Sequence, residues 1–125
     1  MKPFFLDNET PIPYDVDDTL IIWDDECHKG PQEGRTEIIC PYDGAITHHL
    51  LHKRHISLLK KHKSRGKGIV VWSAAGAAWA NVVVQTLDLE EYVDVIMCKP
   101  GTYVDDLDVS EWMGNRVYLG PLKID

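Results

Sequence analysis

The sequence has no hydrophobic run long enough to cross a membrane. A membrane-spanning helix needs about 20 consecutive apolar residues, and no apolar stretch of this chain approaches that length. The apolar residues 4–6 are also too few for a signal peptide, and we interpret them as part of a packed N-terminal arm. We therefore expect a protein that neither crosses a membrane nor carries a secretion signal.

Cysteine and positive charge are also scarce. Three cysteines are an odd number without the spacing of a disulfide framework, which favours reduced thiols in a cytoplasm-like compartment. The net charge of -7 argues against non-specific binding to a nucleic-acid backbone by the surface as a whole. With 125 residues and 44% hydrophobic content, the chain suits one packed domain, residues 1–125, rather than a disordered segment.

The most informative stretch is an acidic motif at residues 15–19, Asp-Val-Asp-Asp-Thr. Asp15 and Asp17 are two residues apart, and in an extended chain such residues point to the same face. Converging carboxylates need a cation or a shared proton, and oxygen ligands suit magnesium. The motif alone fits an acidic, solvated turn equally well. Pro11 and Pro13 require the preceding strand to be short or to tolerate missing hydrogen-bond donors.

Alternating strand-like and helix-like segments predict an α/β fold. The continuous apolar run at residues 69–72 is typical of a strand buried on both faces of a parallel sheet. A helix is predicted next, over residues 77–87, and a strand over residues 92–98. A short helix at residues 109–113 and a last strand at residues 117–119 complete the pattern. We expect a three-layer, Rossmann-like, mostly parallel sheet with helices on both faces.

Residues 20–40 contain two apolar runs around a polar, turn-rich stretch, which predicts a β-hairpin. The residues that a zinc site could use are Cys27, His28, Cys40, His48 and His49. Their spacing matches no zinc-ligand pattern. We therefore interpret the segment as a hairpin with incidental thiols rather than a zinc site.

A basic helix is predicted over residues 45–65, because Leu51, Leu58 and Leu59 recur at helical spacing and Gly66 follows. Its basic residues could bind a polyanion, but we interpret them as a solvated face whose cations suit the helix C-terminus. The histidines of this segment, taken as surface or boundary residues, are His48, His49, His52, His55 and His62.

Polar residues follow the predicted strands at their carboxyl ends, where functional groups of a parallel sheet collect. These residues are Asp15, Asp17, Ser73, Lys99, Asp105 and Asp106. Ser73 opens the small-residue loop 73–76, which can present a hydroxyl and free N–H groups to an anion. Ser73 could equally be the N-cap of the next helix.

Taken in order, these motifs resemble those of the haloacid dehalogenase-like phosphohydrolases. The matching residues are Asp15-x-Asp17-x-Thr19, Ser73 after an apolar strand, Lys99, and the pair Asp105-Asp106. The resemblance covers about residues 12–119, and residues 72–80 and 99–106 look similar to small members encoded by bacteriophages. No segment is long enough for a large cap domain, so a nearly capless form with the 20–40 hairpin as a flap is implied.

The resemblance implies a magnesium-dependent phosphatase that works through an aspartyl phosphate. Asp15 would be the nucleophile, and Asp17 would protonate the leaving oxygen and then activate water. Magnesium would bind Asp15, the backbone carbonyl of Asp17 and Asp106, while Asp105 would orient Lys99 or a metal-bound water. The phosphoryl oxygens would be held by Ser73, Ala74, Lys99 and Thr19.

An open site of this kind is expected to accept a phosphorylated small molecule, a nucleotide or a nucleic-acid end, in the host cytoplasm if the chain is phage-encoded. Two other classes remain open. A receiver-like phosphoacceptor would need an Asp where the strand before Ser73 ends in Trp72. A non-catalytic phosphate-binding or partner-binding domain of the same fold would have no reason to keep the acid at Asp17.

Overall fold

The computed structural model describes residues 10–120, so the N-terminal arm predicted at residues 4–6 lies outside the described part. Three strands form a parallel sheet in the order β1-β5-β6. They are β1 (Ile12–Asp15), β5 (Ile69–Ser73) and β6 (Val95–Cys98). The last residue of β1 pairs with Trp72 and the last residue of β5 pairs with Cys98, so the strands end at the same edge of the sheet. The predicted α/β class is confirmed.

β1 tolerates its proline because it is an edge strand in the described part of the chain. The Ile12 N–H donates to the carbonyl of Gly68 (2.8 Å), so Ile12 faces β5. Alternate residues of a parallel strand bond to opposite sides, which turns Pro13 toward the edge that pairs with no described strand. A residue without an N–H group is tolerated at such an edge.

Two helices connect the parallel strands, α1 (Lys53–Ser64) and α2 (Ala77–Thr86). Parallel crossovers are almost always right-handed, so two successive crossovers in one direction put both helices on one face. Tyr14 and Val71 of that face join Leu59 of α1 and Val83 of α2 in the hydrophobic core. Met97 on the opposite face is exposed. The prediction of helices on both faces is therefore wrong for residues 10–120.

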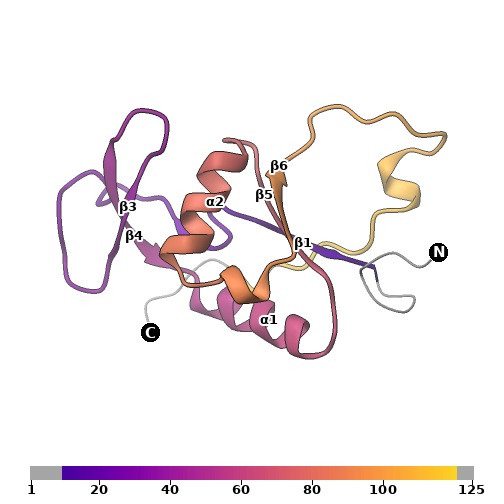
Figure 1. The fold of residues 1–125 in the computed structure, drawn as a ribbon, viewed down its shortest axis with the longest axis horizontal. Coiled ribbons are helices and arrows are strands. Elements are labelled where there is room, and N and C mark those ends of the chain that lie inside the picture. Colours follow the sequence, from indigo (N-terminus) through magenta and orange to yellow (C-terminus); the bar gives the residue numbers. More distant parts are fainter. Residues whose placement is uncertain (1–9, 121–125) are drawn as a thin grey trace.

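A small antiparallel sheet stands beside α2, with the strand order β2-β4-β3 (Figure 1). Its strands are β2 (Ile21–Ile22), β3 (Thr36–Ile39) and β4 (Ile46–Leu51). The predicted 20–40 hairpin is wrong in its pairing, because β2 and β3 each pair with β4 and not with each other. The hairpin that forms joins β3 to β4 through a turn closed by a hydrogen bond from Cys40 N–H to Ala45 O (2.8 Å).

The helix predicted over residues 45–65 is half wrong, because its first part is β4. α1 begins only after His52, whose Nδ1 accepts a hydrogen bond from the His55 N–H (3.2 Å). The histidines were predicted at the surface or its boundary, and this is wrong for four of them: His48, His49, His52 and His55 are buried, whereas His62 is half-buried. Among residues 10–120, no helix is both long enough and apolar enough to span a membrane.

The chain after β6 forms a long loop on the side of the sheet away from α2 and the antiparallel sheet (Figure 1). The predicted strand at residues 92–98 begins only at Val95, after the 3-10 turn η1 (Glu90–Tyr92). The predicted short helix is the single 3-10 turn η2 (Val109–Glu111). No strand forms at residues 117–119, because this segment packs on α1, where the Leu119 N–H donates to His55 Nε2 (2.9 Å).

Candidate functional site

Three polar residues meet where the parallel strands end. Asp15 ends β1, Ser73 ends β5, and Lys99 directly follows β6. The ammonium nitrogen of Lys99 lies 3.9 Å from Asp15 Oδ1, and the Lys99 N–H donates to the Ser73 carbonyl (2.9 Å). Both side chains are accessible, with 47% of Lys99 and 33% of Asp15 exposed. The strand ends thus present a carboxylate and a cation together at an open edge.

A tight turn carries the chain from β1 to β2. The Val16 carbonyl accepts hydrogen bonds from the N–H groups of Thr19 (3.2 Å) and Leu20 (2.9 Å). Asp18 has a φ of +62°, a left-handed conformation that Asp tolerates better than most residues. The turn brings the Thr19 hydroxyl to Asp15 Oδ2, to which it donates (3.3 Å).

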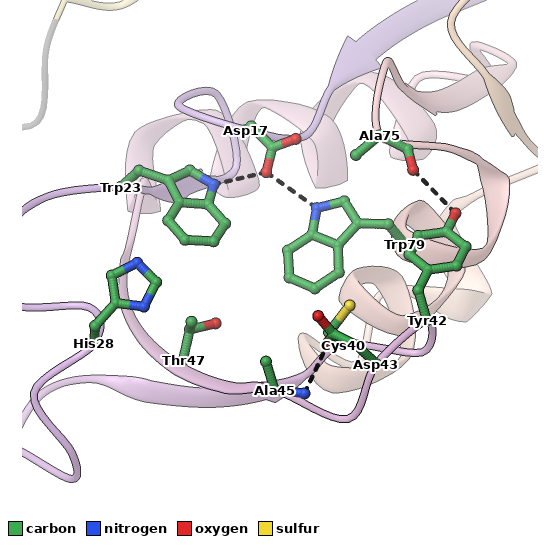
Figure 2. A pocket seen from close by; sticks show the side chains of 10 residues that line it. All are labelled: Asp17, Trp23, His28, Cys40, Tyr42, Asp43, Ala45, Thr47, Ala75 and Trp79. Carbon is green, nitrogen blue, oxygen red and sulfur yellow. Dashed lines mark hydrogen bonds between the residues drawn. The ribbon is translucent and has the colours of Figure 1, made fainter.

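Three donors converge on the carboxylate of Asp17, and Figure 2 shows two of them, the indoles of Trp23 and Trp79. The indole N–H groups of Trp23 and Trp79 donate to its Oδ1 at 2.7 and 3.0 Å. The Ser73 hydroxyl donates to its Oδ2 at 3.3 Å. Both oxygens of the Asp17 carboxyl therefore accept hydrogen bonds in this structure. Sequence reasoning missed both tryptophans, although a buried indole N–H normally has a partner, which was the available signal.

The loop after β5 is held from two sides. Ser73 is fully buried, and its Oγ accepts a hydrogen bond from the Ala75 N–H (3.0 Å). The N-cap position of α2 is Gly76, so Ser73 is not the N-cap of that helix. The Tyr42 hydroxyl, from the β3–β4 turn, donates to the Ala75 carbonyl (2.9 Å). Ala74 lies exposed at the tip of this loop.

Asp105 and Asp106 are not brought to this site. Both are exposed in the loop that follows β6, where Asp105 Oδ1 accepts a hydrogen bond from the Leu107 N–H (3.0 Å). Across residues 10–120, no three side chains of His, Cys, Asp or Glu are grouped so that they could hold a metal ion. The site as described therefore contains Asp15, Asp17, Thr19, Ser73 and Lys99. The roles predicted for Asp105 and Asp106 stay predictions.

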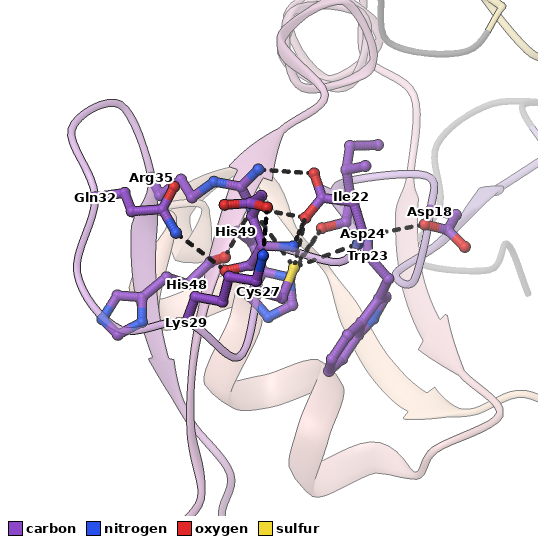
Figure 3. A network of polar contacts seen from close by, with 11 residues as sticks. Asp18, Ile22, Trp23, Asp24, Cys27, Lys29, Gln32, Arg35, His48 and His49 are labelled. Carbon is purple, nitrogen blue, oxygen red and sulfur yellow. Dashed lines mark hydrogen bonds and ion pairs between the residues drawn. The ribbon is translucent and has the colours of Figure 1, made fainter.

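A separate polar network fixes the loop between β2 and β3 (Figure 3). Arg35 forms a two-pronged ion pair with Asp24, at 2.9 and 2.7 Å, and these hydrogen bonds lower the pKa of the Asp24 carboxyl to about 2. Cys27 Sγ lies 3.5 Å from His49 Nδ1. Burial raises the pKa of the Cys27 thiol, which favours the protonated, unreactive form. We interpret this network as a structural anchor of the loop.

A cavity of about 360 Å³ opens beside Asp17 (Figure 2). It is lined by Asp17, Trp23, His28, Cys40, Tyr42, Asp43, Ala45, Thr47, Ala75 and Trp79. Because Asp17 bonds Ser73 with one oxygen and the two indoles with the other, the cavity adjoins the strand-end site. A second hollow, of about 530 Å³, lies against α1 and Leu119 and contains none of the site residues.

Comparison with known proteins identifies no relative of this chain. No protein-family model matches the chain, and neither a curated protein nor a solved structure gives a significant match to it.

Proposed function

We propose that the protein is a phosphatase that moves the phosphoryl group of a phosphomonoester first to Asp15 and then to water. The observation that supports this proposal most is the meeting of Asp15 and Lys99 at the carboxyl ends of parallel strands, 3.9 Å apart. Ligands of open α/β sheets bind at this edge. A carboxylate nucleophile beside a cation suits phosphoryl transfer, which depends mainly on positioning and charge neutralisation.

In the first step, an oxygen of Asp15 attacks phosphorus, and the bond from phosphorus to the leaving oxygen breaks. Asp17 gives a proton to that oxygen and later takes one from the water that hydrolyses the aspartyl phosphate. Lys99 neutralises charge on the phosphoryl oxygens. Hydroxyl and N–H donors for these oxygens would come from Thr19, Ser73 and Ala74. The Ser73 hydroxyl now bonds Asp17, so it must turn to serve this role.

A magnesium ion would supply the remaining charge neutralisation, and two groups at the strand ends fit it. The carboxylate of Asp15 is partly exposed. The backbone carbonyl of Asp17 receives none of the hydrogen bonds of the turn, which go to the carbonyls of Val16 and Ile21. The carboxylate of Asp17 fits poorly, because its oxygens already accept from Trp23, Trp79 and Ser73. Magnesium takes one or two carboxylates and keeps several waters. Asp106 would be the second carboxylate ligand, and Asp105 would orient Lys99 or a metal-bound water.

The proposed substrate is a phosphorylated small molecule or a nucleic-acid end, in the cytoplasm. The antiparallel sheet beside α2 would serve as the flap, and the hydrogen bond from Tyr42 of its β3–β4 turn to the loop after β5 supports this role. The proposed enzyme has no large cap domain in the described part of the chain.

One observation favours a second candidate, a domain of this kind that binds phosphate without turnover. Asp105 and Asp106 lie in an exposed loop and form no hydrogen bond or ion pair with Asp15 or Lys99. A domain lacking the second carboxylate ligand could still bind an anion through Lys99 and the loop 73–76. Turnover separates the two candidates.

The test of the proposed function is hydrolysis of nitrophenyl phosphate with and without magnesium. We expect turnover that stops in excess chelator, and loss of both turnover and covalent phosphate labelling in Asp15→Asn, because no nucleophile remains. Asp25→Asn is the matched control, since Asp25 is an exposed acid of the β2–β3 loop outside the site. Full activity in excess chelator, or in Asp15→Asn, would overturn the proposal, and binding of phosphate without turnover would support the second candidate.

A further inference from the structure

The cavity beside Asp17 has an aromatic wall. The rings of Trp23 and Trp79 lie side by side, with their planes tilted by 32° and their centroids 6.2 Å apart. Figure 2 shows both indoles on one side of the cavity, His28 and Tyr42 at its two ends, and Thr47 across from them. The volume of about 360 Å³ lies in the range of roughly 300–1,000 Å³ that is usual for small-molecule sites.

The two indoles line the cavity with ring carbon atoms, because their N–H donors are turned away from it. Both indole N–H groups are turned to Asp17, and their six-membered rings point the opposite way, into the cavity (Figure 2). Flat aromatic rings stack on such surfaces, and every nucleobase offers a face for stacking. The lining offers few polar side chains besides Asp17, among them His28, Asp43 and Thr47. The cavity therefore suits a planar ring with a small number of polar edges.

Asp17 joins this cavity to the proposed chemistry. The acid that protonates a leaving oxygen must lie within hydrogen-bond reach of that oxygen. A leaving group positioned at Asp17 has the cavity directly beside it, because the same carboxylate oxygen bonds Trp23 and Trp79. A ring carried by the leaving group would then enter the cavity. Two acids on the lining, Asp17 and Asp43, disfavour a second phosphate nearby.

We propose that this cavity binds the base of a nucleoside monophosphate whose phosphate is held at Asp15 and Lys99. This inference rests on the proposed phosphatase function, and it narrows the substrate from any phosphorylated small molecule or nucleic-acid end to a single nucleotide. Recognition of the ring by stacking makes the site tolerant of which base is present.

The first test needs no turnover. Adenosine and uridine, which carry no phosphate, are titrated against the wild-type protein while tryptophan fluorescence is followed. We expect quenching, and we expect Ala45→Phe to weaken the apparent affinity at least tenfold, because Ala45 lines the cavity and a larger side chain there would occupy part of it. Ile46→Phe is the matched control, since Ile46 is the exposed neighbour that does not line the cavity. Absence of quenching in the wild type, or equal affinity in both variants, overturns the proposal.

The second test distinguishes failure of the nucleotide-binding proposal from failure of the phosphatase proposal. The ratio of kcat/KM for adenosine monophosphate to kcat/KM for glycerol phosphate is measured in the wild type and in both variants. We expect a ratio well above one that falls at least tenfold in Ala45→Phe and stays the same in Ile46→Phe. A wild-type ratio near one overturns the nucleotide proposal and leaves the phosphatase standing. Absence of turnover of both esters overturns the phosphatase proposal. In that case the quenching by nucleosides alone tests whether the cavity binds a base.

Discussion

His55 links the site turn to the C-terminal part of the described chain through a neutral imidazole. Its Nε2 accepts the Leu119 N–H (2.9 Å), so Nδ1 must carry the proton and donate to the Thr19 carbonyl (2.7 Å). The ring is buried and stacks on His52, with centroids 3.7 Å apart. A charged imidazole would lose the acceptor that Leu119 uses.

This arrangement predicts loss of stability in acid. Burial lowers the pKa of His55 below its ordinary value near 6.5. The unfolded state then binds more protons, so the contribution is complete above about pH 6.5 and is lost as the pH falls through the folded-state pKa. We expect the free energy of unfolding, measured with urea at pH 7, 6 and 5, to decrease, and to decrease less steeply in His55→Gln.

His28→Gln is the control for this series, because His28 is exposed and lies outside that contact. Burial also lowers the pKa of His49 and His62, so part of the slope should remain in His55→Gln. The same slope in wild type and His55→Gln would contradict the interpretation.

At the scale of elements, the loop from β5 to α2 depends on a glycine. Gly76 has a φ of +111°, a backbone conformation that residues other than glycine rarely adopt. A Cβ at this position would also overlap the Tyr42 hydroxyl, which bonds the Ala75 carbonyl. The close approach of the β3–β4 turn to this loop therefore requires a residue without a side chain.

We predict that Gly76→Ala lowers the free energy of unfolding by about 1–3 kcal/mol, the usual cost of a residue held in a rare conformation. Urea denaturation measures this change. Gly101→Ala should stay within about 0.5 kcal/mol of the wild type, because Gly101 has no positive φ and no atom within 4 Å of an added Cβ. Equal losses in both variants would show that the Tyr42 contact and the positive φ do not restrict Gly76.

At the scale of the molecule, one core joins both sheets. Ile38 of β3 belongs to the same buried cluster as Val71 of the parallel sheet, Leu59 of α1 and Val84 of α2. A shared core leaves neither sheet with apolar surface of its own to fold around, so the two should unfold together.

We therefore predict a single cooperative transition in urea. Trp23 and Trp79 line the cavity beside the antiparallel sheet and contribute to the tryptophan fluorescence together with Trp72 of β5, while far-UV circular dichroism reports the helices. The two midpoints should coincide. Trp112→Phe removes an exposed tryptophan of the loop after β6 as a control on the fluorescence signal. Two separated midpoints would indicate that the antiparallel sheet is a unit of its own.

The sequence alone was sufficient to predict elements that depend on residues nearby in the chain. It was also sufficient to predict a strand that is buried on both faces of the sheet. The continuous apolar run at β5 and the helix that follows it were predicted nearly to their ends. The placement of Asp15, Ser73 and Lys99 at strand ends followed from the same pattern, because parallel strands joined by helices end at one edge.

Tertiary structure decided the rest, because the deciding partners are distant in sequence. β4 was predicted as the first part of a helix, yet it is a strand, because β2 and β3 each pair with it. The same holds at the site, where Trp79 reaches Asp17 across 62 residues. Residues 15–19 by themselves predict two converging carboxylates. Only the packing of α2 and the β2–β3 loop around them determines that one carboxylate is open to Lys99 while the other is held by two indoles.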